Sequence, residues 1–194
     1  MDQYLEQLLV SPERAIPLLI KGAVGVLPTD TVYGLTARAH DKQAVARLYA
    51  LKHREHKPGT IVAASTQQLL DLGVSPTHLS KIRHLWPASI SIETPLGGSL
   101  RYLHQDTGRQ GLRVVADARL RTILEQTGPL LTSSANQPGA PGATDVTQAW
   151  KYFGTTIDFY VDGGDLSGRS PSTIIRITDT GAIEIIRQGA VKLP

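Results

Sequence analysis

The sequence contains no cysteine among its 194 residues. Disulfide bonds, thiolate nucleophiles and cysteine-type zinc sites are therefore excluded, and the composition suits a reducing cytosol, so we expect a cytoplasmic protein. No apolar run approaches the roughly 20 residues that a membrane-spanning helix needs. Aromatic residues make up only 5% of the chain, which leaves few rings for stacking on nucleic-acid bases.

Common catalytic signatures are missing as well. The chain has no Gly-x-Ser-x-Gly nucleophile elbow, no His-Glu-x-x-His zinc motif, no Gly-x-Gly-x-x-Gly after a strand and no kinase signature. What remains is the composition of an ordinary globular protein, 41% hydrophobic and 19% charged. Its length fits one domain spanning residues 1–194. The net charge of +3 agrees with an anionic ligand such as a nucleotide or RNA, and it serves solubility equally well.

Strand-like and helix-like segments alternate along the chain, which predicts an α/β fold. Ser11-Pro12 begins the first expected helix and Asp41 caps the second. Further helices are expected at 67–72, 76–85, 118–126 and 145–153, and strands at 24–27, 60–64, 90–93, 112–115, 130–132, 157–161, 172–177 and 182–187. The last two strands, separated by Thr180-Gly181, predict a hairpin, and a hairpin in an alternating chain favours a mixed sheet.

Two polar stretches in the first half suggest ligand contacts. Pro28-Thr29-Asp30-Thr31-Val32-Tyr33-Gly34-Leu35 follows a buried strand, and ligands commonly lie at strand ends in α/β sheets. A tight turn with an Asx-type bond from Asp30 explains the same residues. Lys52, Arg54 and Lys57 place three cations in one loop, which suits a polyphosphate. A solvated charge run beside a helix C-terminus is the alternative.

Two further stretches lie in the second half. Thr132–Gly142 runs from a strand into small hydroxyl residues, glycine and proline, and such loops let backbone N–H groups approach an anion. Ser172-Thr173 opens a strand and Arg187 ends its hairpin partner, so both are expected near one edge. Arg113 stands inside an apolar strand, where it needs either an acidic partner or an anionic ligand.

Together these stretches resemble the YrdC family, whose enzymes make L-threonylcarbamoyladenylate. The matching motifs, in family order, are PTDTVYGL at 28–35, Lys52-x-Arg54 with Lys57-Pro58, Gly111-Leu112-Arg113, Ser134-Ala135-Asn136, Ser172-Thr173-Ile174 and Ile186-Arg187-Gln188-Gly189. The resemblance implies a twisted mixed α/β sheet with flanking helices and a concave basic cavity. It also implies that L-threonine, bicarbonate and ATP, with Mg²⁺ on the phosphates, give the adenylate and pyrophosphate. A partner complex then transfers the threonylcarbamoyl group to tRNA, and direct tRNA binding by this chain is a further candidate contact.

The resemblance also assigns roles to individual positions. Lys52 and Arg54 are the catalytic candidates and are expected to hold phosphates. Threonine is expected at Thr31, Arg113 and Ser172, with Arg113 at the carboxylate. The nucleotide-binding set comprises Lys52, Arg54, Ser134, Asn136, Gly142 and Arg187. No metal-ligating residue is identified, because the His53/His56 pair has no supporting ligands.

Three positions depart from the family pattern: Glu55 in a shortened cationic loop, Ala63 where some relatives have histidine, and Ser89 within Trp86-Pro87-Ala88-Ser89-Ile90-Ser91. These differences bear on how tightly threonine is bound and on which subfamily the chain belongs to. Two rival interpretations remain open from the sequence. One is a non-catalytic RNA-binding or ribosome-associated module of the same fold, and the other is a relative that activates a different small molecule.

Overall fold

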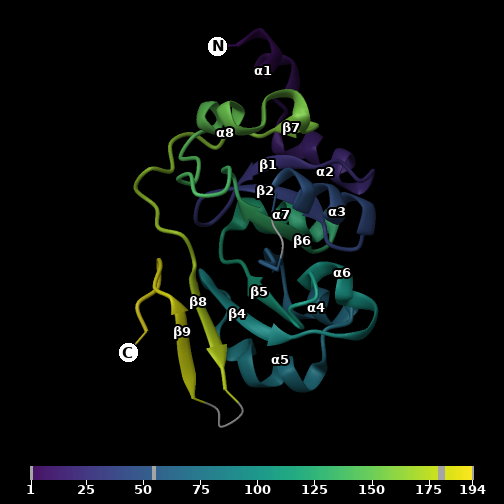
Figure 1. Cartoon of the computed structure of the whole chain (residues 1–194), viewed down its shortest axis with the longest axis vertical. Helices are drawn as coiled ribbons and strands as arrows, with labels where there is room; N and C mark the ends of the chain where they lie inside the picture. Colours follow the sequence, from purple (N-terminus) through teal and green to yellow (C-terminus); the bar gives the residue numbers. More distant parts are fainter. Residues whose placement is uncertain (1, 54–55, 179–181, 194) are drawn as a thin grey trace.

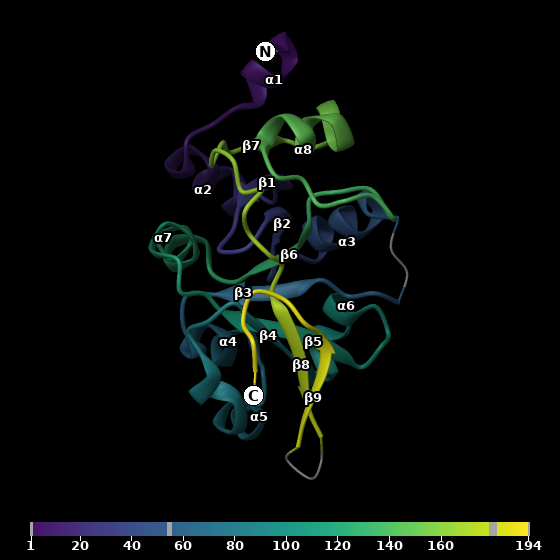
Figure 2. The same ribbon diagram turned by 90° about the vertical axis from the view of Figure 1, so that its left-hand side faces the viewer.

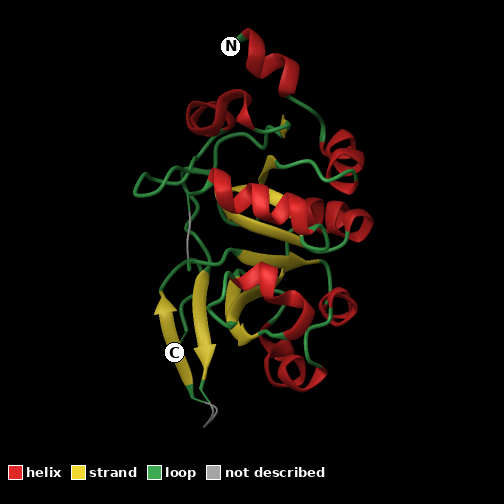
Figure 3. Ribbon diagram, turned by 45° about the vertical axis from the view of Figure 1, so that its right-hand side comes forward, coloured by secondary structure: helices red, strands yellow, loops and turns green. Residues whose placement is uncertain are grey.

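The computed structural model describes residues 2–53, 56–178 and 182–193. Nine strands of these segments form one sheet in the order β7-β1-β2-β6-β3-β5-β4-β8-β9. Three of the eight strand pairings, β1–β7, β3–β5 and β4–β8, are parallel, and the other five are antiparallel. The predicted mixed sheet is confirmed, and Figure 3 shows the helices gathered around it.

The strands are β1 (Gly25–Pro28), β2 (Tyr33–Arg38), β3 (Thr60–Ala63), β4 (Ile90–Pro95), β5 (Arg109–Val114), β6 (Leu130–Ser134), β7 (Phe159–Tyr160), β8 (Thr173–Ile177) and β9 (Ile183–Arg187). The α-helices are α1 (Gln3–Leu8), α2 (Pro12–Ile20), α3 (Lys42–Leu51), α4 (Thr66–Leu72), α5 (Pro76–Ile82), α6 (Arg101–His104), α7 (Ala118–Thr127) and α8 (Val146–Phe153). Short 3₁₀ helices cover Arg83–Leu85, Gly98–Leu100 and Gly154–Thr156. Figure 1 shows α1 and the β8–β9 hairpin at opposite ends of the long axis.

The predicted helix starts are confirmed by side-chain caps. Ser11 Oγ accepts from the Arg14 N–H, and Asp41 Oδ1 accepts from the N–H groups of Gln43 and Ala44. These bonds satisfy donors that have no partner within the first turn of a helix. The predicted terminal hairpin is also confirmed as β8 and β9, while its turn residues Thr180 and Gly181 lie outside the described residues.

The core occupies both faces of the sheet because successive strand residues point to opposite sides. In β6, Leu130 packs in a cluster with α2 and α7, whereas Leu131 joins the larger cluster on the other face. In β3, Val62 and Ile61 divide in the same way. Each face therefore has its own helical cover.

Three elements were not predicted from the sequence: α1, α6 and strand β2. The PTDTVYGL motif predicts a ligand-contacting turn after a strand, but the turn is confined to 29–32 and Tyr33 begins a buried strand. The strand is hard to predict because Gly34 interrupts its run of apolar residues. A Cβ on Gly34 would lie 2.5 Å from Thr132 Oγ1 of the adjacent β6, so close packing explains the glycine.

A long connection, residues 161–172, joins β7 on one edge of the sheet to β8 near the other edge. Figure 2 shows it descending across the strands between these positions. Tyr33 holds it in place, since its hydroxyl donates to Gly164 O at 2.9 Å and accepts from Gly163 N at 2.7 Å. The connection thereby brings Ser172 and β8 to the residues of the β1–β2 turn.

Candidate functional site

A cleft of about 150 Å³ lies where the β1–β2 turn meets strands β2, β3, β5, β6, β8 and β9. Five of the residues predicted for the site line it together: Thr31, Arg113, Ser134, Ser172 and Arg187. Lys52, Asn136 and Gly142 lie outside its lining. Arg54 falls outside the described residues, so its predicted phosphate contact stays a prediction.

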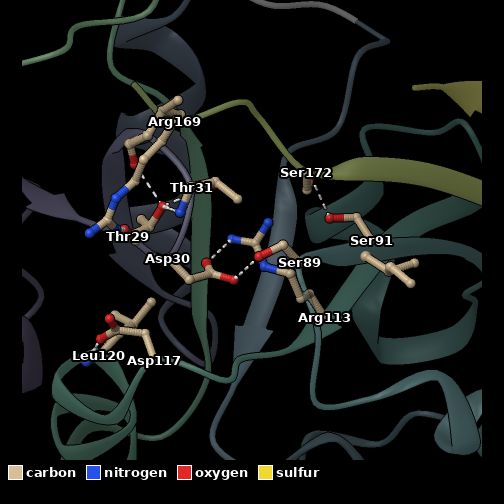
Figure 4. A network of polar contacts seen from close by, with 12 residues as sticks. Thr29, Asp30, Thr31, Ser89, Ser91, Arg113, Asp117, Leu120, Arg169 and Ser172 are labelled. Carbon is tan, nitrogen blue, oxygen red and sulfur yellow. Dashed lines mark hydrogen bonds and ion pairs between the residues drawn. The ribbon is translucent and has the colours of Figure 1, made fainter. Parts of the chain in front are cut away.

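Arg113 of β5 forms a buried ion pair at the back of the cleft. Its Nη2 lies 3.0 Å from Asp30 Oδ1, and the two side chains are only 4% and 5% exposed. Ser89 Oγ donates to the other carboxylate oxygen at 3.1 Å, as Figure 4 shows. Burial lowers the pKa of Arg113, and the neighbouring Asp30 carboxylate opposes that effect. The acidic partner that the sequence required for Arg113 is therefore Asp30.

The ion pair does not use all of the guanidinium. Within the described part of the chain, the buried Nε of Arg113 has no hydrogen-bond partner. An unpaired buried donor costs roughly 1–3 kcal/mol. Because Arg113 also lines the cleft, it keeps the capacity to bind an anion there.

The β1–β2 turn is held by Thr29. Its hydroxyl donates to Val32 O at 2.6 Å and accepts from Thr31 N at 3.2 Å. The Thr31 hydroxyl lies 3.1 Å from the same oxygen and is buried. The proposed Asx-type bond from Asp30 is therefore not what closes this turn, and Asp30 is left to pair with Arg113.

Arg187 reaches back from edge strand β9 to Ser172. Its Nε and Nη2 donate to Ser172 O at 3.1 and 2.7 Å, and Nη2 also lies 3.2 Å from Ser172 Oγ. Gly189 permits this approach, since a Cβ there would lie 2.2 Å from Pro171 O. The prediction that Ser172 and Arg187 meet near one edge is confirmed.

Lys52 is buried at the C-terminal end of α3 and holds the loop after β6. Its Nζ donates to Ser134 O at 2.7 Å, to Asn136 Oδ1 at 2.8 Å, and to Asn136 O. Ser134 Oγ donates to Asn136 Oδ1 at 2.6 Å. Gly142 belongs to this loop, and a Cβ there would be 3.9 Å from Ser134 Cβ. The predicted nucleotide contacts of Lys52, Asn136 and Gly142 stay predictions, and the geometry adds a loop-holding role for Lys52.

A second groove of about 520 Å³ adjoins the cleft, since Pro58, Gly59, Thr60 and Ile174 line both. Lys57, from the predicted cationic loop, lines this groove together with Arg109 and Arg176. Glu93 pairs with Arg176 at 2.6 Å. Glu93 also lines the groove and lies 3.9 Å from Arg109 Nε, so it offsets part of the positive charge on this side of the cleft.

Sequence reasoning named Asp30 and Ser89 but did not place them in the site, and it missed the buried hydroxyl of Ser91. Ser91 Oγ donates to Ser172 Oγ at 3.0 Å. The available signal was the charge of Arg113, which stands between two apolar residues and requires a partner; Asp30, between two threonines, gave no such signal. Ser91 had no comparable local signal, because a serine in a strand is unremarkable.

Tyr33 offers a test of the connection that crosses the sheet. Burial raises the pKa of Tyr33 to about 12. The hydrogen bond from the Gly163 N–H acts in the opposite direction, and the nearby Asp162 carboxylate raises the pKa further. A raised pKa means that the folded state favours the neutral phenol, so stability present below about pH 10 is lost as pH rises through about 12. We expect Tyr33→Phe to show a smaller fall in unfolding free energy across this window in denaturant titrations. Tyr4→Phe, at a side chain 62% exposed, is the control and should keep the wild-type profile. A Tyr33→Phe slope equal to that of the wild type would contradict the prediction.

Within residues 2–53, 56–178 and 182–193, no group of three or more His, Cys, Asp or Glu side chains is placed to hold a metal ion. The Asp30 carboxylate is already engaged by Arg113 and Ser89. None of the helices in these segments has both the length and the apolar character needed to cross a bilayer.

Comparison with known proteins adds four findings. The Sua5/YciO/YrdC family model, described as "Telomere recombination", matches residues 17–189. Threonylcarbamoyl-AMP synthase of Coxiella burnetii is 32% identical over 190 residues, covering 94% of this chain and 98% of that protein. A crystal structure of P. abyssi Sua5 complexed with L-threonine matches with a TM-score of 0.80 at 26% identity, covering 92% of this chain and 54% of the longer one. E. coli YciO shares the fold, with a TM-score of 0.79 at 23% identity over 93% of this chain and 90% of that one.

Proposed function

The chain belongs to the Sua5/YciO/YrdC family, and on this premise we propose that it is an L-threonylcarbamoyladenylate synthase. Its substrates are L-threonine, bicarbonate and ATP, and its products are the adenylate, pyrophosphate and water. The relative from C. burnetii is named for this activity, and the match to it covers 98% of that protein. As an enzyme class, this is a nucleotidyltransferase.

The chemistry requires two bonds to form. The threonine amine adds to the bicarbonate carbon and water leaves, which gives a carbamate. A carbamate oxygen then bonds to the α-phosphorus of ATP as the bond to the β-phosphate oxygen breaks, releasing pyrophosphate. The reactants carry a carboxylate, bicarbonate and a triphosphate, so positioning and charge neutralisation are the main tasks for the protein.

The observation that carries this proposal is the cleft itself. It combines two arginines, Arg113 and Arg187, with the hydroxyl groups of Thr31 and Ser172. Arg113 is the residue we assign to the threonine carboxylate, because its Nε is buried and without a hydrogen-bond partner within the described residues. An arginine fork suits a carboxylate better than a point charge does.

The nucleotide is assigned to the adjoining groove and to the loop at Ser134. The cleft's volume of about 150 Å³ suits an amino acid, and the groove of about 520 Å³ suits a larger ligand. Lys52 and Asn136 would order the loop that contains Gly142, while Arg54 would reach the phosphates. Since the described residues offer no carboxylate cluster, Mg²⁺ would be held by the ATP phosphates and enter as part of the substrate.

The product is proposed to serve tRNA modification. A separate threonylcarbamoyl-transferase complex would consume the adenylate, with tRNA as the final acceptor and the cytoplasm as the location. These assignments rest on the naming of the relatives and on the sequence resemblance.

The decisive experiment is an assay of the purified protein with ATP, Mg²⁺, L-threonine and labelled bicarbonate. We expect pyrophosphate release that depends on both threonine and bicarbonate, with label in an adenylate product. Turnover without threonine, or none under any condition, would contradict the proposal. Serine in place of threonine is the specificity control, because one methyl group in a pocket is worth about 1–3 kcal/mol.

A further inference from the structure

The hydroxyl of Ser91 lies directly behind the cleft, in contact with Ser172. Ser91 belongs to β4 and its residue is fully buried, with a relative exposure of 0%. It is flanked by Ile90 and Ile92, whose side chains belong to the hydrophobic core. Its Oγ donates to Ser172 Oγ at 3.0 Å, the bond drawn in Figure 4. Ser172 lines the cleft and Ser91 does not, so any effect of Ser91 on a ligand passes through Ser172.

The acceptor capacity of Ser172 is used from two sides. Its Oγ accepts from Ser91 Oγ and lies 3.2 Å from the donating Nη2 of Arg187. A serine hydroxyl has two acceptor positions and a single proton to donate. Both acceptor positions are therefore filled by protein donors. Within the described part of the chain, no hydrogen bond donated by Ser172 Oγ is formed, so its proton is left for a ligand.

The backbone of Ser172 is fixed independently. Arg187 binds its carbonyl through Nε and Nη2, and the next residue, Thr173, is paired with Ile90 of β4. The side chain then keeps two torsions, χ1 and the rotation of the hydroxyl, and the contacts of Oγ with Ser91 and with Arg187 Nη2 restrain them. Ser91 is the group that restrains the hydroxyl from within the sheet.

We propose that Ser91 is a positioning residue that turns the Ser172 hydroxyl into a directed donor toward a substrate oxygen. The acceptor in best agreement with the neighbouring Arg113 and Arg187 is an oxyanion, and we assign it to the carboxylate of the amino acid. This inference rests on the proposed function for the identity of that substrate. A threonine carboxylate keeps its charge throughout the reaction, so the contact strengthens ground state and transition state alike.

Loss of such a uniform contact raises KM and leaves kcat unchanged. One neutral hydrogen bond is worth about 2- to 10-fold in affinity. We therefore expect Ser91→Ala to raise both the Kd and the KM for L-threonine about 2- to 10-fold, with kcat within about twofold of wild type. The KM for ATP should not move.

The experiment compares Ser91→Ala, Ser91→Thr, Ser172→Ala and the double variant Ser91→Ala/Ser172→Ala. Threonine binding is measured by calorimetry and turnover by pyrophosphate release. Ser91→Thr retains the hydroxyl and should recover most of the affinity. In the double variant, loss of Ser91 should add nothing to the loss of Ser172, since interacting residues are not additive. Thr127→Val is the matched control, because Thr127 is another fully buried hydroxyl, bonded to Ile123 O and Gly128 O outside the cleft.

The two proposals fail in different ways. Wild-type protein that binds threonine without turnover would overturn only the proposed function, and the Kd values of the variants would still decide this inference. Normal wild-type turnover with an unchanged threonine Kd in Ser91→Ala would overturn only this inference. Additive effects in the double variant, or an equal loss in Thr127→Val, would also overturn it. If Ser91→Ala fails to fold, Ser91→Cys, which keeps a similar side-chain size but is only a weak donor, supplies the same comparison with Ser172→Ala.

Discussion

Replacing Asp30 with alanine is expected to lower the unfolding free energy by about 3–5 kcal/mol. The stability is lost because Arg113, the ion-pair partner of Asp30, remains in the variant. Arg113 is 4% exposed, so its charge would be left in the interior without compensation. Turnover is expected to fall about 10- to 100-fold as well, because small misplacements of a substrate-binding group are costly. Denaturant titration and pyrophosphate release measure the two effects.

An exposed ion pair of the same length provides the control for this result. Arg101 Nη2 lies 3.0 Å from Asp106 Oδ1, but both side chains are about two-thirds exposed or more, at 72% and 67%. Arg101→Ala is expected to cost about 0–1 kcal/mol, since solvent screens such pairs. Asp106 is left untouched because its φ of 62° favours aspartate over alanine.

A second comparison separates burial of charge from loss of packing. The double variant Asp30→Ala/Arg113→Leu removes both charges, and apolar replacement of a buried pair is often close to neutral. It should therefore be more stable than Asp30→Ala alone, although inactive. A loss below about 1 kcal/mol in Asp30→Ala, or no recovery in the double variant, would show that the pair is solvated.

The Asp30–Arg113 pair also shows which features of the site can be predicted from the sequence and which cannot. An arginine between apolar neighbours in a predicted strand requires a partner, so its need was predictable. The identity of the partner was not, because it depends on the order in which β2, β6, β3 and β5 lie side by side. That order depends on pairing between strands that are distant in the sequence. The local pattern Leu112-Arg113-Val114 does not predict it.

The alternation of helices and strands, the mixed sheet and the terminal hairpin were predictable from periodicity and turn residues. Strand β2 was not, since a motif dense in hydroxyl groups resembles a loop until its pairing with β1 and β6 is known. Ser91 illustrates the same limit within the site. Its strand was predicted, but which residue its hydroxyl meets depends on the parallel register of β4 and β8.

The sequence predicts that Lys52 holds phosphates, and its buried surroundings raise the expected effect of replacing it. It is only 1% exposed, and its three bonds to Ser134 and Asn136 fill the donor capacity of an ammonium group. We expect Lys52→Met to lower kcat/KM for ATP about 100- to 1,000-fold, as loss of a preorganised charged donor does elsewhere. Unfolding free energy should fall by at least about 1.5–3 kcal/mol, the worth of one charged hydrogen bond.

We expect both the loss of kcat/KM and the loss of stability because Lys52 holds the loop after β6 in place. Without Nζ, the oxygens of Ser134 and Asn136 lose their shared donor, and we expect the loop to present a less well-defined geometry to a nucleotide. If Lys52 acts through this loop, Asn136→Ala should cause a large part of the same loss, and Lys52→Met should add little in the Asn136→Ala background. Fully additive losses would instead assign Lys52 to the phosphates alone. Lys151→Met, at an exposed position in the last turn of α8, is the control for removal of one positive charge and should retain wild-type kinetics.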